Sequence, residues 1–233
     1  MASEEYAAIY AIGDVHGCVN ELLSLEKKII ADGLRIDGPK LIVMLGDYID
    51  RGPSSAAVIE HLLTPLPQDY SRVCLAGNHD QMFLDFLQKP SARSPWLTLG
   101  GDETLASYGV YLDDVREHPL ASQLRALVPQ EHVDFLRLLP VMLRIDRYCF
   151  VHAGVDPSAP IDEQTDEVLT TSRPHEFDWT SYNGRLTVVH GHTPVPEVTV
   201  IGPRINLDIK VYESGRLAAL RIQDGKLTVI FSD

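Results

Sequence analysis

Short apolar runs that end in polar turns containing glycine recur along this chain of 233 residues. The runs have four to six residues and carry many β-branched side chains, a pattern that favours buried strands over helices. They are Ala7–Ile12, Leu41–Leu45, Val73–Ala76, Tyr148–Val151 and Leu186–Val189.

Helical patterns separate the first three strands. Val19–Ile30 places its leucines and isoleucines on one stripe, and Ser54–Leu63 follows Pro53, a favourable first-turn residue. Strand, turn and helix repeating at about 30 residues is the βαβ pattern, which predicts a largely parallel sheet. Ligands of such sheets bind beyond the carboxyl ends of the strands, where all five polar turns lie.

The rest of the chain divides into a helical part and a strand-rich part. Residues 81–140 predict helices, with a turn and helix start at Gly100–Thr104. After His192 four apolar runs with intervening turns predict a closing β-meander, at Val198–Ile201, Ile205–Ile209, Leu217–Ile222 and Leu227–Phe231. No linker interrupts the pattern, so we expect a single domain over residues 1–233.

Composition excludes several classes of protein. The hydrophobic fraction of 45% is too high for a disordered chain, and no apolar run approaches the roughly 18 residues of a membrane helix. Glu4 and Glu5 stand where a signal peptide would be basic, and three cysteines give no even disulfide framework. We therefore expect a cytoplasmic protein with reduced thiols.

The formal net charge of −13 bears on the partners. This charge repels the backbone of nucleic acids, so nucleic acid is not an expected partner. A membrane is not expected either, because no apolar run is long enough to span it. It also repels phosphorylated molecules, so any phosphate chemistry would need positive charge concentrated in metal ions or in a few arginines. The oligomeric state is not indicated by the sequence.

The polar turns have an unusual composition. Solvated loops would also contain serine, threonine, lysine and glutamate, but these turns offer mainly aspartate, asparagine and histidine. Carboxylate, amide and imidazole without thiolate suit Mn²⁺, Fe or Zn²⁺. The residues are Asp14, His16, Asp47, Asp50, Arg51, Asn78, His79, Asp80, His152, His190 and His192. Asp80 is interpreted as a cap of the next helix.

Five motifs now carry a resemblance. They are Gly-Asp-Val-His-Gly (13–17), Gly-Asp-Tyr-Ile-Asp-Arg-Gly (46–52), Gly-Asn-His-Asp (77–80), His-Ala-Gly (152–154) and His-Gly-His-Thr (190–193). In this order they resemble the calcineurin-like metallophosphoesterases, and more narrowly the small bacterial members of the phosphoprotein phosphatase branch. The resemblance implies an α/β fold with a central β-sandwich of mixed sheets flanked by helices (αββα).

The resemblance also implies a pair of divalent cations, with Mn²⁺ expected first and Fe or Zn²⁺ as alternatives. Their ligands would be Asp14, His16, Asp47, Asn78, His152 and His190. Asp47 would bridge the two ions, and His192 is a further candidate ligand. A hydroxide held between two such cations can attack phosphorus directly.

The remaining site residues would handle the substrate. By the resemblance, His79 is the general acid for the leaving oxygen, and Asp50 orients it and keeps it protonated. Arg51 and Arg173 would bind the phosphate oxygens, together with Asn78.

Three functions stay open at this point. The first is hydrolysis of phosphoserine or phosphothreonine in proteins, and the alternative is hydrolysis of dinucleoside polyphosphates such as diadenosine tetraphosphate. A lesser alternative is a non-catalytic metal-binding scaffold. Symmetrical dinucleoside tetraphosphatases of this family usually lack the acidic residue found here as Asp50, which favours the phosphomonoester. The expected partner is thus a phosphoprotein or a small phosphorylated substrate.

One segment departs from the family pattern. Relatives commonly carry Asp-Thr-Gly-Ala after the last histidine motif, whereas this chain has Asp208-Ile209-Lys210. The bulky and charged side chains make the shape of this loop, and of the substrate groove beside it, an open question.

Overall fold

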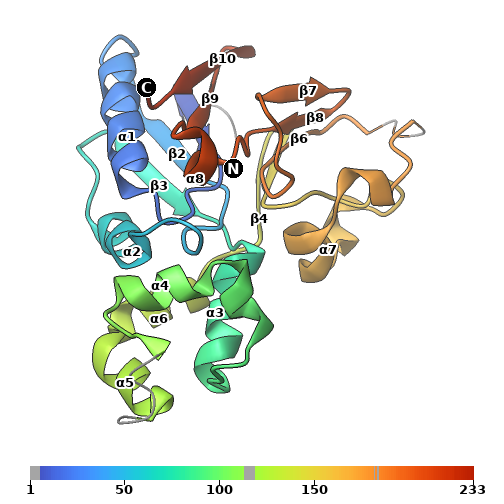
Figure 1. Cartoon of the computed structure of the whole chain (residues 1–233). Helices are drawn as coiled ribbons and strands as arrows, with labels where there is room; N and C mark the ends of the chain where they lie inside the picture. The colour runs from blue at the N-terminus through green and yellow to red at the C-terminus, as the bar shows by residue number, and fades with distance from the viewer. Residues whose placement is uncertain (1–5, 113–118, 181, 183) are drawn as a thin grey trace.

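Two five-stranded mixed sheets form the centre of the molecule (Figure 1). The computed structural model describes residues 6–112, 119–180, 182 and 184–233. The first sheet has the order β10-β9-β1-β2-β3, and the second has the order β4-β5-β6-β8-β7. The strands of the first sheet are β1 (Ala8–Ile12), β2 (Lys40–Met44), β3 (Tyr70–Cys74), β9 (Ala218–Gln223) and β10 (Lys226–Phe231). Those of the second are β4 (Met142–Ile145), β5 (Tyr148–Val151), β6 (Thr187–His190), β7 (Thr199–Ile201) and β8 (Arg204–Asn206).

Alternation along the strands produces three apolar layers. In β1, Ile9 and Ala11 face the second sheet, whereas Tyr10 and Ile12 face the helices α1 (Val19–Gly33) and α2 (Ser55–Leu63). The outer face of the second sheet packs on Leu169 of α7 (Asp166–Thr171). Because both faces of each sheet are covered, the central strands are buried throughout. The sandwich of mixed sheets flanked by helices is therefore confirmed.

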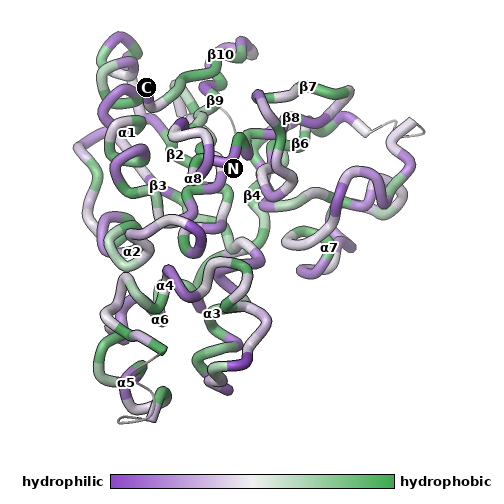
Figure 2. The backbone as a smooth tube through the Cα atoms, viewed as in Figure 1, coloured by the Kyte–Doolittle hydropathy of each residue, from purple (hydrophilic) through white to green (hydrophobic). Residues whose placement is uncertain are grey.

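A helical part follows β3 and lies at one end of the sandwich (Figure 1). Its elements are α3 (Asn78–Gln88), η2 (Pro95–Leu99), α4 (Gly101–Ser107), α5 (Leu120–Leu127) and α6 (Gln130–Arg137). Hydrophilic and hydrophobic residues alternate around α1 and these helices (Figure 2), as expected when one face covers a core. The predicted helices and the helix start after Gly100 are confirmed.

The predicted closing meander is wrong. β7 and β8 belong to the second sheet, where β8 runs parallel to β6, whereas β9 and β10 pair antiparallel in the first sheet. Ile205–Ile209 is not one strand, because β8 ends at Asn206 and the chain turns through α8 (Val211–Ser214) to reach the other sheet. Alternation of apolar residues is the same in either sheet, so it could not distinguish them.

The strand ends bring the polar turns together. The backbone N–H groups of Val15 and His16, after β1, donate to the carbonyl of Asp47, after β2, at 3.1 and 2.9 Å. In the second sheet, the N–H of Leu207, after β8, donates to the carbonyl of His190, at the end of β6, at 2.8 Å. Cys18, Cys74 and Cys149 are free thiols. Within the described ranges, no helix combines the length and the hydropathy required to cross a bilayer.

Candidate dinuclear metal centre with an acid pair

The polar turns hold strained backbone conformations. Nine non-glycine residues of the described part of the chain have a positive φ, and six of them lie in or beside the predicted site. The six are His16, Asp47, Asp50, Arg51, His192 and Lys210. Each such conformation costs of order 1–3 kcal/mol and persists only where the surrounding packing imposes it. The site is thus held rigidly by its scaffold.

Two glycines allow two carboxylates to come close. A Cβ placed on Gly77 would lie 2.1 Å from Oδ1 of Asp47, and one on Gly191 would lie 1.8 Å from Oδ1 of Asp14. Any side chain at either position would displace a predicted metal ligand. The glycines of the Gly-Asn-His and His-Gly-His motifs are therefore required by close approach.

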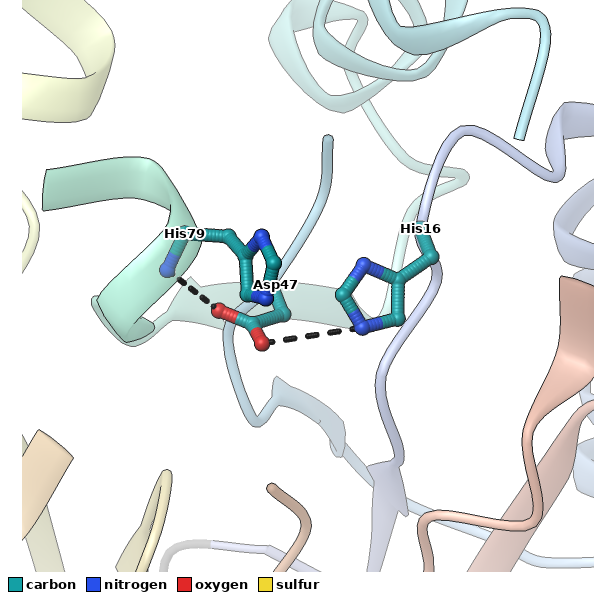
Figure 3. A group of neighbouring side chains, drawn as sticks. All are labelled: His16, Asp47 and His79. Atoms are coloured by element: carbon teal, nitrogen blue, oxygen red, sulfur yellow. Dashed lines mark hydrogen bonds and ion pairs between the residues drawn. The ribbon is translucent and has the colours of Figure 1, made fainter. Parts of the chain in front are cut away.

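Asp47 is the meeting point of the site. Its Oδ1 accepts a hydrogen bond from the backbone N–H of His79 at 2.9 Å, and its Oδ2 lies 3.6 Å from Nε2 of His16 (Figure 3). The same Oδ2 lies 3.3 Å from Nε2 of His152. The carboxylate expected to bridge two cations therefore lies between imidazoles from β1 and β5 turns.

The histidine rings are oriented as metal ligands. Nδ1 of His16 lies 2.8 Å from Ile49 O, and Nδ1 of His152 lies 2.9 Å from Leu45 O. A carbonyl accepts only from a protonated Nδ1, so each ring can turn an unprotonated Nε2 toward Asp47. Asn78 completes this side, with Oδ1 3.0 Å from Nε2 of His152.

The electrostatics of these rings also fit a cation. Burial lowers the pKa of His16 to about 3, which keeps this ring neutral and ready to ligate. Burial also disfavours the charged form of His152, but the charge of Asp47 and the hydrogen bond to it raise the pKa of that ring to about 10. A divalent cation would replace this proton, so binding releases protons. The donor set of buried carboxylates, amide and imidazoles thus fits two divalent cations.

The other predicted ligands lie around this centre. Asp14 is buried and accepts a hydrogen bond from the backbone N–H of His192 at 3.0 Å, while Nε2 of His192 lies 3.1 Å from Thr171 O. His190 is buried, with Nδ1 3.0 Å from Gly191 O, and burial lowers its pKa to about 4.

Two groupings of carboxylate and imidazole atoms share Asp47. Among the described residues around this aspartate, such ligand atoms lie within 4.8 Å of one another in His16–Asp47–His79 and in Asp47–His152–His192. Asp14 and His190 are in neither group.

A second cluster holds the predicted acid. Nδ1 of His79 lies 2.6 Å from Oδ2 of Asp50, which is fully buried. That Oδ2 also accepts from Trp96 Nε1 at 2.7 Å, and Oδ1 accepts from the hydroxyl of Thr104 at 2.6 Å. Sequence reasoning missed these two donors, because nothing local links Asp50 to residues 46 and 54 positions further along the chain.

The protonation of His79 is set by opposing charges. Burial disfavours the charged ring, but Asp47 and the hydrogen bond to Asp50 raise its pKa, and Arg51 lowers it again; the net direction is upward. Arg51 Nη2 lies 3.1 Å from Nε2 of His79. Since the guanidinium only donates, this contact requires an unprotonated Nε2. The arginine and the proton therefore compete for one ring nitrogen.

Arg51 itself is held by an aromatic residue that the sequence did not indicate. Its Nη1 donates to the hydroxyl of Tyr212 at 2.8 Å, and the guanidinium lies 4.8 Å from the centre of that ring. The Tyr212 ring also meets His16 edge-on at 5.3 Å. Tyr212 follows the segment that departs from the family pattern, and its ring lies against the arginine that is predicted to bind phosphate.

The departing segment keeps a glycine-like backbone. Lys210 has a φ of 57°, the left-handed conformation that glycine adopts most readily, and its Nζ lies 3.5 Å from Glu213. Arg173 immediately precedes η5 (Pro174–Glu176) and is half-buried. Burial lowers the pKa of His192, and the charge of Arg173 contributes to lowering it further. The phosphate-binding role of Arg173 stays a prediction.

Asp80 does more than cap α3. Its Oδ2 accepts from the backbone N–H of Gly77 and of Asp47, both at 2.9 Å, and Oδ1 accepts from Tyr48 N–H at 3.1 Å. The predicted cap is present, and the same carboxylate fixes the turn that carries Asp47.

Comparison with known proteins agrees with this geometry. Residues 7–232 match the family model for calcineurin-like phosphoesterases. The chain belongs to this family. It is 27% identical to an asymmetrical bis(5'-nucleosyl)-tetraphosphatase PrpE from Oceanobacillus iheyensis, over 95% of this chain and 91% of that protein. It is 30% identical to the protein of the same name from Geobacillus thermodenitrificans, over 90% of this chain and 88% of that protein.

A solved structure supports the fold. A crystal structure described as that of a candidate diadenosine tetraphosphatase superposes with a TM-score of 0.68 at 22% identity, over 99% of this chain and 96% of that one. At this identity the likeness concerns the fold alone. Family membership makes this chain a metal-binding phosphoesterase, and the resemblance of its motifs to the calcineurin-like metallophosphoesterases is confirmed.

Proposed function

We propose that the chain hydrolyses a phosphoanhydride bond of dinucleoside polyphosphates, with bis(5'-nucleosyl) tetraphosphates as the main substrate class. The observation that carries this proposal is the match, nearly end to end, with relatives named as asymmetrical tetraphosphatases. It reverses the order that Asp50 suggested from the sequence, where the phosphomonoester stood first. The close approach of Asp47, His16, His152 and Asn78 supports the metal-dependent chemistry that this reaction needs.

The chain's own residues divide the work. Two divalent cations, held by Asp14, His16, Asp47, Asn78, His152 and His190, would neutralise phosphate charge and supply a nucleophile at neutral pH. Arg51 would leave Nε2 of His79 to grip phosphate oxygens, because a phosphate is a stronger acceptor for the guanidinium. Nε2 could then carry a proton toward the leaving oxygen, with Asp50 stabilising the charged ring.

A second candidate, hydrolysis of phosphoserine or phosphothreonine, is favoured by one observation. The Asp50–His79 contact at 2.6 Å, backed by Trp96 and Thr104, is well built to protonate a poor leaving group. An alkoxide needs this proton more than a phosphoanhydride leaving group does.

A rate comparison tests both candidates. The Mn²⁺-loaded protein would be assayed on diadenosine tetraphosphate, on phosphoserine and phosphothreonine peptides, and on phosphotyrosine peptides. We expect the highest kcat/KM on the dinucleotide, with ATP and AMP as products if cleavage is asymmetrical. Formation of two molecules of ADP would instead show symmetrical cleavage. Faster turnover of the phosphoserine and phosphothreonine peptides would favour the protein phosphatase activity over the proposed one.

Metal dependence is tested on the same substrates. Chelator-treated protein should be inactive, and Mn²⁺ should restore turnover better than Mg²⁺. Asn78→Ala and His152→Ala should lose one of two bound Mn²⁺ and abolish turnover. Full activity in the chelator would overturn the metal centre, whichever substrate is preferred.

A further inference from the structure

Asp208 lies beside two turns of the candidate metal centre, although no predicted ligand set includes it. It follows β8, which pairs with β6 so that Asn206 stands opposite His190. On its other side the segment touches the β1 turn, since a Cβ on Gly13 would lie 2.6 Å from Leu207 O. Asp208 is thereby placed between the turn that carries Asp14 and the turn that carries His190.

The two carboxylate oxygens of Asp208 have different surroundings. The side chain is 2% exposed, and Oδ1 accepts a hydrogen bond from Lys210 N–H at 3.0 Å. Oδ2 is buried and has no hydrogen-bond partner among the described residues. A buried carboxylate oxygen is costly when it lacks a donor or a cation. Oδ1 therefore stabilises the turn, whereas Oδ2 makes no hydrogen bond within the described residues.

The charges facing Asp208 make this cost larger. Asp14, Asp47 and Asp208 are all buried, so three carboxylates are enclosed in neighbouring turns of the site. Negative charges enclosed together in this way repel one another. Removing one charge, or adding a cation, would relieve this repulsion.

We propose that Asp208 is a further carboxylate of the metal centre, with Oδ2 contributing to the binding of the cation assigned to Asp14 and His16. This inference rests on the metal centre of the proposed function. Its charge suits that place, because two divalent cations carry four positive charges and the ligands Asp14 and Asp47 supply two negative ones. Asp208 would add a third negative charge. It makes no hydrogen bond to Arg51 among the described contacts, so the guanidinium stays available for phosphate.

The test uses Asp208→Asn, which keeps an oxygen for Lys210 N–H and removes the charge. A matched control is Asp156→Asn, because Oδ1 of Asp156 makes the same contact two residues ahead, to Ser158 N–H at 2.8 Å, outside the ligand set. Mn²⁺ affinity and stoichiometry would be measured by calorimetry and by the spin-resonance signal of free Mn²⁺. Thermal unfolding would be followed in chelator and at saturating Mn²⁺.

We expect Asp208→Asn to bind Mn²⁺ about 10–100-fold more weakly, while Asp156→Asn keeps the wild-type affinity. In chelator Asp208→Asn should melt at the wild-type temperature or above it, because repulsion with Asp14 is removed, and Mn²⁺ should raise its Tm less. Asp208→Ser, which also offers an oxygen to Lys210, should behave in the same way and serves if the asparagine variant folds poorly.

Two results would overturn parts of this account separately. Wild-type Mn²⁺ affinity in Asp208→Asn, or an equal fall in Tm with and without Mn²⁺, would reduce Asp208 to a turn residue. Failure of the wild-type protein to bind Mn²⁺ would instead overturn the metal centre itself.

Discussion

Two histidine–carboxylate pairs in this chain have the same nitrogen–oxygen distance of 2.6 Å, but only one belongs to the candidate site. His79 contacts Asp50 at the end of the sheets, and His61 contacts Glu26 between α1 and α2. Both carboxylates are buried, with Asp50 fully enclosed and the Glu26 side chain 6% exposed. Distance and burial alone therefore do not distinguish a catalytic pair from a structural one.

The difference lies in the other neighbours. Glu26 is closed off by Arg72, whose Nη2 lies 2.8 Å from its second oxygen, so the three groups form an ion cluster within the fold. Asp50 instead receives neutral donors, Trp96 and Thr104, and its charge acts on His79. His79 in turn faces Asp47 and Arg51. A histidine–carboxylate pair can thus take part in chemistry when the second ring nitrogen of the histidine faces other reactive groups.

The largest contrast is expected between His79→Asn and His61→Asn. The first should lower the rate on alkyl phosphomonoesters by about 10²–10⁴-fold, because the leaving alkoxide loses its acid, while Mn²⁺ stays bound. The second should leave kcat within about twofold. The measurement is steady-state kinetics with p-nitrophenyl phosphate as a substrate that needs little protonation. Equal losses for His79→Asn on both esters would contradict the acid role.

Asp50→Asn should lower kcat by about 10–100-fold and change the pH profile. Asp50 helps to raise the pKa of His79, and the protonated acid is present below that pKa and lost as the pH rises through it. Without the carboxylate this pKa falls, so the alkaline limb of kcat should move to lower pH. If the alkaline limb of kcat stays at the wild-type pH, deprotonation of His79 does not cause that limb.

Tyr212→Phe should have a smaller effect, confined to binding. Loss of the hydroxyl that accepts from Arg51 should raise KM about 3–10-fold with little change in kcat, since the ring still lies against the guanidinium. Tyr212→Ala, which removes the ring as well, should raise KM further. A fall in kcat at constant KM would show that Tyr212 acts on the chemical step instead.

Glu26→Gln should change stability and leave turnover unaltered. Burial raises the pKa of Glu26, but His61 and Arg72 outweigh it and lower the pKa overall. The resulting stability is present above the ordinary carboxyl pKa and is lost as the pH falls through the lowered one. The variant should therefore unfold about 3–5 kcal/mol more easily at neutral pH, with a smaller difference in acid. Denaturant titration at neutral and at acid pH would measure this difference in stability. If the folded Glu26→Gln variant lost activity, the His61–Glu26 pair would not be purely structural.

The sequence predicted much of the site because its signals are local. A strand of alternating or continuous apolar residues followed by a glycine turn fixes where the next polar side chain lies relative to the sheet. Asp14, Asp47, Asn78 and His152 follow strands in this way, and the structure brings the ends of these strands, from both sheets, together at the site. The sheet assignment of β7–β10 failed because an apolar strand carries no mark of the sheet that it joins.

What the sequence determined by itself is the chemistry offered at each strand end: carboxylate, amide and imidazole for cations, and an aspartate and a histidine for a proton. Only the tertiary structure decided which distant groups control them. Thr104 and Trp96 reach Asp50, and Tyr212 reaches Arg51, across 54, 46 and 161 residues. Such contacts depend on how helices and crossing segments pack over the sheets, and packing of this kind leaves no periodic trace in the chain.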